Sequence, residues 1–487
     1  MKVNVALRKS ENEVIKLEAC KGETLYDVLS RNGIELNAPC GGRGKCGKCR
    51  VKYRLWGDTK EQDVLACRTA IEGDCEVMLF RTENRILTSG QRTKYDTDGI
   101  GDFSLAVDIG TTTIAAYLLD NKSGRQLAAA SCLNPQRIHG ADVISRIGFS
   151  DQSTDNKALL QSEILSMIQE VLKRLLKDAK MPDDSTVSVR SLVGNTAMMH
   201  LAGGFNTIGI AKAPYLPEYT ALHTQSLRGN DYLMGGCVSG YVGADTLAAM
   251  LSCDLDKARD NVLLLDIGTN GEIVLKCGNK YTCCSCAAGP AFEGAHISCG
   301  TGAVNGAVDH IKPSENRFSY TTIAGEAASG LCGSGLVDAV AYLLDEERIT
   351  PVGRMKERFD IAPGVFIDPA DIREVQLAKA AISAGIEILT ERAGISFSEI
   401  DRVLLAGGFG NFIDVHSACK IGLLPKALEE KIETVGNAAG DGAKMLALSV
   451  KARERSEALR SVTQYIELSA QDDFEDTYTD NLLFDLD

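Results

Sequence analysis

The stretch LAVDIGTTTIAAYLLD, Leu105 to Asp120, consists of two apolar runs separated by a short polar turn. The apolar runs are typical of buried strands, and the glycine allows a tight reversal between them. A turn that binds phosphate needs free backbone N–H groups, small hydroxyl side chains and room for the ligand. The turn supplies all three through Gly110, Thr111, Thr112 and Thr113. The carboxylate of Asp108 would repel phosphate, so its natural partner is Mg²⁺, held through water.

The same pattern returns in LLLDIGTNGEIVLK, which begins at Leu263 and places Asp266 in register with Asp108, about 158 residues later. One such turn indicates a hairpin as readily as a binding site, but two in register indicate an internal duplication. We therefore predict an α/β region with two similar lobes whose facing turns enclose a cleft. The second turn contributes Gly268, Thr269 and Asn270.

A third glycine cluster, LLAGGFGN, follows an apolar stretch around Val403. Gly407 and Gly408 would end a strand there and let a nucleoside approach the backbone. Two other segments can be interpreted either as ligand contacts or as helix caps. Asn195 and Thr196 form either a nucleotide contact or a helix cap, and the segment from Gly333 to Gly335 forms either an anion site or a cap.

The stretch CGGRGKCGKC, Cys40 to Cys49, holds three cysteines and four glycines. With Cys67 the spacing is C-x5-C-x2-C-x17-C, which favours a 2Fe–2S cluster on Cys40, Cys46, Cys49 and Cys67. Tetrahedral zinc is the alternative, although structural zinc sites usually take their cysteines as two close pairs. We expect Cys20 and Cys75 to lie in the core. The run CCSC, Cys283 to Cys286, is also interpreted as core, since neighbouring cysteines cannot reach the corners of one cluster.

A chain of 487 residues is too long for one hydrophobic core, so we expect several domains. Two alternating strands and a helix capped by Thr24 precede the cysteine loop, and further strands follow it. A polar stretch with several glycines comes next, and the rest of the chain has an α/β pattern. The last residues, from Gln471, carry seven acidic and no basic side chains, which indicates a solvated end, although apolar residues there would allow packing. The predicted divisions are a small domain around the cysteine loop at 1–80, a linker at 81–102, two α/β lobes at 103–260 and 261–450, and a C-terminal extension with an acidic tail at 451–487.

The net charge of −14 argues against nucleic acid and anionic membranes as partners, because both would repel the protein. No apolar run has the length of a membrane span, and the first ten residues lack the apolar core of a signal peptide. With 16 cysteines and no export signal, the expected location is the cytoplasm.

The order of turn, helix, turn and glycine cluster resembles the superfamily of actin, sugar kinases, acetate kinases and heat-shock ATPases. That resemblance implies that the two turns bind the phosphates of ATP and that Gly407 and Gly408 face the adenosine. The segments GADTLAA, from Gly243, and GNAAGDGAKMLAL, from Gly436, match the two connecting helices. Asp245 stands where the heat-shock ATPases carry an acidic residue near Mg²⁺ and the attacking water, so the resemblance implies a catalytic set of Asp108, Asp245 and Asp266.

The whole chain resembles the reductive activators of corrinoid enzymes. The resemblance is carried by the cysteine loop together with VGNTAMMHLAGG, GYVGADTLAAM, AAGPAFEGAHISCGTGA and LLAGGFGNFIDV. It implies a small β-grasp ferredoxin-like domain followed by a duplicated two-lobe actin-like ATPase domain. It also implies a 2Fe–2S cluster, ATP and Mg²⁺ as cofactors, and electron transfer that returns a corrinoid protein of a methyltransferase system from Co(II) to Co(I). An external low-potential donor would reload the cluster. Typical members have a longer insert between cluster and ATPase than residues 81–102, which leaves a docking or dimerising domain in doubt.

Three other functions stay open from the residues alone. The first is a small-molecule kinase with a regulatory cluster, and the second is a redox sensor whose cluster controls nucleotide-dependent binding. The third is an activase of another low-potential metalloenzyme, such as the 2-hydroxyacyl-CoA dehydratases, whose activators carry a 4Fe–4S cluster across a dimer. The sequence does not give the client protein, the electron donor, the cluster potential or the choice between monomer and homodimer.

Overall fold

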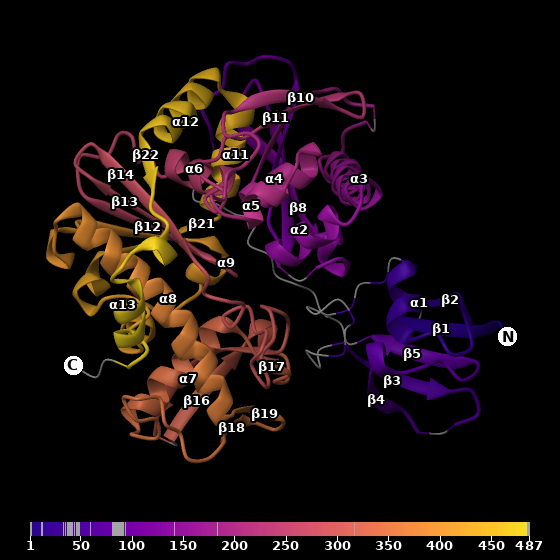
Figure 1. The fold of residues 1–487 in the computed structure, drawn as a ribbon. Helices are drawn as coiled ribbons and strands as arrows, with labels where there is room; N and C mark the ends of the chain where they lie inside the picture. Colours follow the sequence, from indigo (N-terminus) through magenta and orange to yellow (C-terminus); the bar gives the residue numbers. More distant parts are fainter. Residues whose placement is uncertain are drawn as a thin grey trace.

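The structure is a computed structural model that describes residues 2–10, 13–32, 34, 36, 42, 44, 49–58, 60–79, 92, 94–140, 142–182, 184–315 and 317–484. Figure 1 shows a small sheet near the N-terminus and two larger sheets with their helices. Within those ranges, none of the helices combines the length and the apolar character that crossing a membrane requires.

The N-terminal domain is a five-stranded sheet in the order β2-β1-β5-β3-β4, with one helix packed on it. The helix begins as expected, because Thr24 accepts a hydrogen bond from the Asp27 backbone N–H at 3.1 Å. Cys75 is buried in this domain, as predicted, whereas Cys20 is exposed at the end of its strand, so its assignment to the core is wrong. The elements of this domain are β1 (Lys2–Ser10), β2 (Glu13–Cys20), α1 (Leu25–Arg31), β3 (Arg50–Leu55), β4 (Gln62–Leu65) and β5 (Cys75–Leu79).

The two larger sheets repeat one arrangement, which confirms the predicted duplication. In the first sheet, β6 pairs antiparallel with β7 and parallel with β9. In the second sheet, β12 pairs antiparallel with β13 and parallel with β20. The orders are β10-β11-β9-β6-β7-β8 and β21-β20-β12-β13-β14-β22, so corresponding strands occupy corresponding positions.

The first lobe contains β6 (Phe103–Ile109), β7 (Thr113–Asp120), β8 (Arg125–Leu133), α2 (Val143–Asp151), α3 (Thr154–Asp178), β9 (Val187–Gly194), α4 (Thr196–Gly203), α5 (Ile208–Ala211), β10 (His223–Leu227), β11 (Asn230–Met234) and α6 (Ala244–Ser252). The second lobe contains β12 (Val262–Ile267), β13 (Gly271–Cys277), β14 (Lys280–Cys286), β15 (Ala307–Ser314), β16 (Arg317–Thr322), β17 (Gly330–Leu331), α7 (Gly333–Asp345), β18 (Phe359–Ala362), β19 (Val365–Ile367), α8 (Pro369–Ala393), β20 (Arg402–Ala406), α9 (Gly407–Gly410), α10 (Val415–Lys420), β21 (Ile432–Gly436) and α11 (Ala438–Leu448). The chain then continues into α12 (Val450–Val462), β22 (Thr463–Tyr465) and α13 (Phe474–Asp480).

Strand β12 is buried on both faces, because side chains alternate along a strand. Leu264 belongs to the core cluster of the first lobe, while Leu263 and Leu265 belong to that of the second. Helices α6 and α11 lie side by side at this junction (Figure 1). A Cβ at Gly442 of α11 would collide with the backbone of Ala248 in α6. The two connecting helices therefore touch backbone to backbone where the lobes meet.

The second half of the stretch expected to be a linker packs on the nucleotide-binding region. Tyr95 is 3% exposed, its N–H donates to the Gly124 carbonyl at 2.9 Å, and its hydroxyl donates to Asp441 of α11 at 2.7 Å. Lys444 completes this buried group, with its ammonium 2.9 Å from the same Asp441 carboxylate oxygen.

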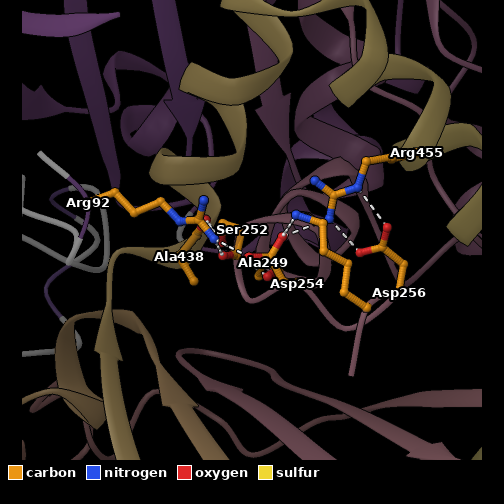
Figure 2. A network of polar contacts seen from close by, with 8 residues as sticks. Arg92, Ala249, Ser252, Asp254, Asp256, Ala438 and Arg455 are labelled. Carbon is orange, nitrogen blue, oxygen red and sulfur yellow. Dashed lines mark hydrogen bonds and ion pairs between the residues drawn. The ribbon is translucent and has the colours of Figure 1, made fainter. Parts of the chain in front are cut away.

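A second attachment of this segment is visible in Figure 2. Arg92 donates to the Ser252 carbonyl at 2.9 Å and pairs with Asp254, just beyond α6. Arg455 of α12 pairs with Asp254 at 2.8 Å and also contacts Asp256. Arginines from two distant parts of the chain thus share one carboxylate at the end of α6.

The acidic C-terminal segment packs on the second lobe, so the expectation of a solvated end is wrong as far as Phe484. Phe484 is 2% exposed, and its N–H donates to the Pro351 carbonyl at 2.8 Å. Lys379 of α8 lies 5.5 Å from the centre of its ring. The apolar residues between the charges supply the contacts, while most of the acidic side chains face water.

Candidate functional site

Two of the four predicted cluster cysteines lie in described parts of the chain, and their sulfur atoms meet. Cys49 directly precedes β3 and Cys67 lies in the 3-10 turn after β4, with the two Sγ atoms 3.1 Å apart. The backbone N–H of Cys67 also points at the Cys49 sulfur, 3.4 Å away. The two sulfur atoms therefore converge on one place, which fits the prediction that both are ligands of the same cluster. Cys40 and Cys46 lie outside the described residues.

Two glycines of the same loop are held against their surroundings. Gly42 and Gly44 have φ angles of +76° and +72°, a conformation that favours glycine. A side chain at Gly42 would collide with the ring of Tyr26 in α1, and the Arg68 guanidinium donates to the Gly44 carbonyl. The loop therefore has close contacts with α1 and with the turn that carries Cys67.

The first predicted phosphate turn is braced from several sides. It connects β6 and β7 and is closed by a hydrogen bond from the Gly110 N–H to the Thr113 carbonyl at 2.9 Å. The Asn195 amide donates to the Thr111 hydroxyl at 2.9 Å while its side-chain oxygen caps α4. The interpretation of Asn195 as a helix cap is therefore confirmed, while a contact with a nucleotide stays a prediction.

The second turn has the same closure, from the Gly268 N–H to the Asn270 carbonyl at 2.9 Å. The third glycine cluster reaches it directly. Gly407 has a φ angle of +83°, and a side chain there would collide with the Asp266 carboxylate. A Cβ at Gly408 would meet no atom within 4 Å, so the backbone beside it is open to a ligand.

Helix α6 brings the third predicted acidic residue to the turns. Asp245 lies in the first turn of α6, and its carboxylate accepts from the Thr246 N–H at 2.8 Å. Gly243 in front of it packs against the backbone of Asn195 and Thr196, where any side chain would collide. The structure thus brings Asp108, Asp245 and Asp266 into electrostatic contact.

Burial raises the pKa values of these three carboxylates, and charge interactions add to the shift of Asp108 and of Asp245. Burial raises the pKa of Asp108 to about 7, with the charge of Asp266 adding and a hydrogen bond from Asn437 opposing. Burial and the charge of Asp108 raise the pKa of Asp245 to about 7, and burial raises that of Asp266 to about 6. Such a group is costly without a cation, which fits a site for a charged metal complex.

The group does not chelate a metal ion by itself. Among the described residues, no three acidic, histidine or cysteine side chains converge closely enough to do so. Mg²⁺ usually keeps several waters and binds one or two carboxylates together with nucleotide phosphates. The arrangement therefore fits Mg²⁺ that arrives with a nucleotide and is held largely through water.

Three residues near the turns escaped the sequence reasoning. Glu272 lies opposite Asp266 in the β12–β13 hairpin, and burial with the charges of Asp245 and Asp266 raises its pKa well above the usual value. Asn437 donates to Asp108 at 3.2 Å from the start of α11. The Glu293 carboxylate accepts from Thr269 at 2.8 Å. Hairpin register would have revealed Glu272, because a tight turn after Asp266 fixes its cross-strand partner.

His200, the cysteines of β14 and the segment from Gly333 all contact neighbouring parts of the protein. His200 is buried, with Nδ1 2.7 Å from the Thr196 carbonyl and Nε2 accepting from the Glu218 N–H at 3.1 Å. Cys283, Cys284 and Cys286 are buried in β14, which confirms their assignment to the core. The segment from Gly333 begins α7 and touches Phe409 of the third glycine cluster.

Three family models match consecutive parts of the chain. Residues 9–72 match the 2Fe-2S iron-sulfur cluster binding domain, residues 103–258 match the RACo middle region, and residues 260–486 match the C-terminal domain of RACo, the ASKHA domain. A solved structure described as a reductive activator for corrinoid, iron-sulfur protein superposes with a TM-score of 0.71 at 25% identity. That superposition covers 99% of this chain and 98% of the other.

Two curated relatives are similar over most of their length. The corrinoid activation enzyme RamQ of Eubacterium limosum is 30% identical over 584 aligned positions, covering 96% of this chain and 97% of the relative. A [Co(II) methylated amine-specific corrinoid protein] reductase of Methanosarcina barkeri is 25% identical, covering 69% of this chain and 68% of the relative. The first alignment is longer than this chain, so RamQ carries segments that this chain lacks. The chain therefore belongs to the family of corrinoid-activating enzymes, in which a 2Fe–2S domain precedes a nucleotide-binding region of the ASKHA type.

Proposed function

We propose that this chain is an ATP-dependent reductive activator that returns the Co(II) of a corrinoid protein in a methyltransferase system to Co(I). The observation that carries the proposal is the joining, in one chain, of a converging cysteine pair and a duplicated phosphate-turn fold. The full-length similarity to a corrinoid activation enzyme supports the choice of client.

In this proposal Cys40, Cys46, Cys49 and Cys67 hold a 2Fe–2S cluster. The close approach of the Cys49 and Cys67 sulfurs supports two of these ligands. When bound, the cluster supplies a one-electron donor, with a potential near −400 mV in plant-type ferredoxins. The Cys67 N–H directed at the Cys49 sulfur would stabilise negative charge there and so raise the potential.

The two turns and the third glycine cluster bind ATP. Backbone N–H groups and hydroxyls at Gly110, Thr111, Thr112, Thr113, Gly268, Thr269 and Asn270 hold the phosphates, while Gly407 and Gly408 admit the nucleoside. Asp108, Asp245 and Asp266 hold Mg²⁺ through water. Mg²⁺ would offset their mutual repulsion and neutralise part of the charge on the phosphates.

Nucleotide binding supplies the energy for an unfavourable electron transfer. Co(I) is a very strong reductant, so the step is uphill from a ferredoxin-like cluster. The turns lie in different lobes, and ATP that contacts both would favour one relative orientation of the lobes over others. The close backbone contact between α6 and α11 supports a pivot at the helix crossing. A change at that crossing would alter how the cluster domain meets the corrinoid protein.

The test is anaerobic absorption spectroscopy of a corrinoid protein in its Co(II) form, mixed with this protein and a reductant. Mg²⁺-ATP should produce the Co(I) or methyl-Co(III) band only when this protein is present. C46A should remove the cluster spectrum and the reduction, whereas C20A, at an exposed cysteine of the same domain, should leave both intact. No cobalt change in the presence of a reducible cluster would contradict the corrinoid client.

Two further expectations belong to the same proposal. An external low-potential carrier reloads the cluster after each transfer, which stopped-flow reduction with a ferredoxin would measure. The choice between monomer and homodimer follows from light scattering with and without ATP. Neither expectation affects the assignment of the cysteines and turns.

A further inference from the structure

Glu293 is fixed in position by its own turn. Its N–H donates to the Pro290 carbonyl at 3.1 Å, and the next residue, Gly294, has a φ angle of +78° and packs against the Thr301 backbone. On the other side, the ring of Phe292 stacks on Phe409 of the third glycine cluster, with centroids 4.8 Å apart. The backbone at Glu293 is thus held by its turn and by Phe292. Phe409, which Phe292 contacts, belongs to the glycine cluster that a nucleotide would approach.

The Glu293 carboxylate lies between the two phosphate turns. Thr269 of the second turn donates its hydroxyl to Glu293 Oε1 at 2.8 Å, and that oxygen lies 3.8 Å from the position of a Cβ at Gly268. Thr112 of the first turn also acts on this carboxylate, since its hydroxyl lowers the pKa of Glu293 and so opposes the effect of burial. Glu293 therefore contacts the second turn directly and interacts with the first.

A carboxylate at this place is unfavourable for simple phosphate binding, because it would repel the nucleotide. The charge of Arg137 lowers the pKa of Glu293, but burial has the larger effect and raises that pKa above its usual value. Such a group becomes useful when a proton donor lies between it and the phosphate. The donor available in a hydrolytic site is water, and a general base must lie within hydrogen-bond reach of the proton it accepts.

We propose that Glu293 is the general base for ATP hydrolysis, which orients the attacking water and accepts its proton; this inference rests on the proposed function. The water oxygen forms a bond to the γ-phosphorus as the bond to the β,γ-bridging oxygen breaks. ADP leaves with the electron pair of that bond. The water proton passes to the Glu293 carboxylate and returns to solvent after phosphate departs.

The position separates this role from that of the other acidic residues. Asp108, Asp245, Asp266 and Glu272 interact with one another electrostatically and form one group. Glu293 instead accepts a hydrogen bond from the Thr269 hydroxyl of the second turn. It is therefore the carboxylate placed to act on a water facing the terminal phosphate, while the others balance Mg²⁺.

The test is E293Q in the full chain. Glutamine keeps an oxygen that accepts from Thr269 and preserves the size of the side chain, but it cannot take up a proton. We expect single-turnover ATP hydrolysis to fall by about 100-fold or more. Calorimetric ATP affinity should stay within about threefold or tighten, because a repelling charge is lost. E374Q, at a residue 3.6 Å from the exposed His296, controls for the same chemical change away from the turns.

Each other outcome is decisive. Hydrolysis by E293Q near the rate of the unaltered protein would overturn the base, and so would an equal loss of rate and ATP affinity. Should E293Q fold poorly, judged by far-ultraviolet circular dichroism and thermal unfolding, E293A with added formate offers a second measurement. Formate must then restore hydrolysis, and its failure to do so counts against the proposal. Absence of hydrolysis in the unaltered protein would overturn the proposed function as well.

Discussion

At the scale of single residues, Asp266 is the point where the separate motifs meet. It lies next to the last residue of β12, packs against Gly407 and contributes to the shifted pKa values of Asp108, Asp245 and Glu272.

D266A should therefore impair the nucleotide reaction and leave the cluster intact. Because Mg²⁺ would lose one of the three carboxylates proposed to hold it, we expect Mg²⁺-ATP turnover to fall by about 10- to 100-fold. The visible spectrum of the 2Fe–2S cluster should not change. Turnover at the normal rate would contradict the assignment of Asp266.

His200 provides a pH dependence that is independent of the site. Burial lowers its pKa to about 4, so it stays neutral in the folded protein while the unfolded chain binds a proton near pH 6.5. Its contribution to stability is complete above about pH 6.5 and is lost as the pH falls towards 4.

H200Q should thus lose less stability on acidification than the unaltered protein. The difference between their unfolding free energies at pH 7 and pH 4.5 should be about 2 kcal/mol. Urea titrations at both pH values measure it, and the comparison of the two proteins cancels the titration of other groups. Parallel pH profiles would contradict the burial effect.

At the scale of elements, the crossing of α6 and α11 depends on a missing side chain. A Cβ at Gly442 would collide with the Ala248 backbone, whereas a Cβ at Gly148 in α2 would meet no atom within 4 Å. Two glycines within helices therefore differ in what an alanine would meet.

G442A should destabilise the protein by about 1–3 kcal/mol, because the helices must move apart. G148A, its matched control, should stabilise by about 0.5–1 kcal/mol, since alanine favours the helix. Thermal unfolding measures both changes. An equal response of the two variants would show that the crossing adapts freely.

The attachment of residues 92–102 gives another prediction. Y95F removes the hydroxyl that donates to Asp441 in a buried group, so we expect a loss of about 1–3 kcal/mol. Y320F, at a tyrosine that is 40% exposed, should change stability by less than about 0.5 kcal/mol. Chemical denaturation of both variants compares them, and an unaffected Y95F would contradict the role of this bond.

How far the sequence could predict these elements depends on the range of the interactions that form them. The capped helix α1, the two strand-turn-strand units and the long amphipathic α3 follow local patterns, and the structure contains them. The pairing of β14 with β22 and the burial of Tyr95 and Phe484 do not follow such patterns. The pairing of β14 with β22 joins segments more than a hundred residues apart, which local patterns do not report. Tyr95 and Phe484 lie in stretches that are polar on average, so composition indicated a loop or a solvated end there.

The candidate site divides in the same way. The motif residues Asp108, Asp266 and Gly407 were predictable because turns and glycines have a local signature. Glu293 carries no such signature, since a single glutamate in a loop is ordinary, and it gains meaning only when folding places it beside Thr269.

At the scale of the whole molecule, the segment from Arg92 ties the N-terminal domain to the junction of the lobes. The chain is held at Arg92 by the end of α6 and at Tyr95 by α11, the two helices that cross there. From Leu79 at the end of β5 to Arg92 there are about 13 residue steps, and a chain of that length spans at most about 45 Å.

This attachment limits how far the 2Fe–2S domain, the electron donor, can lie from the crossing of α6 and α11. Wherever the corrinoid protein binds, its cobalt has to come within a sphere centred on the helix crossing, with a radius fixed by that span and the size of the small domain. Because the covalent connection limits the distance, the donor has a high effective concentration within this sphere. Lengthening the segment between Leu79 and Arg92 would dilute the donor around its target without altering either domain.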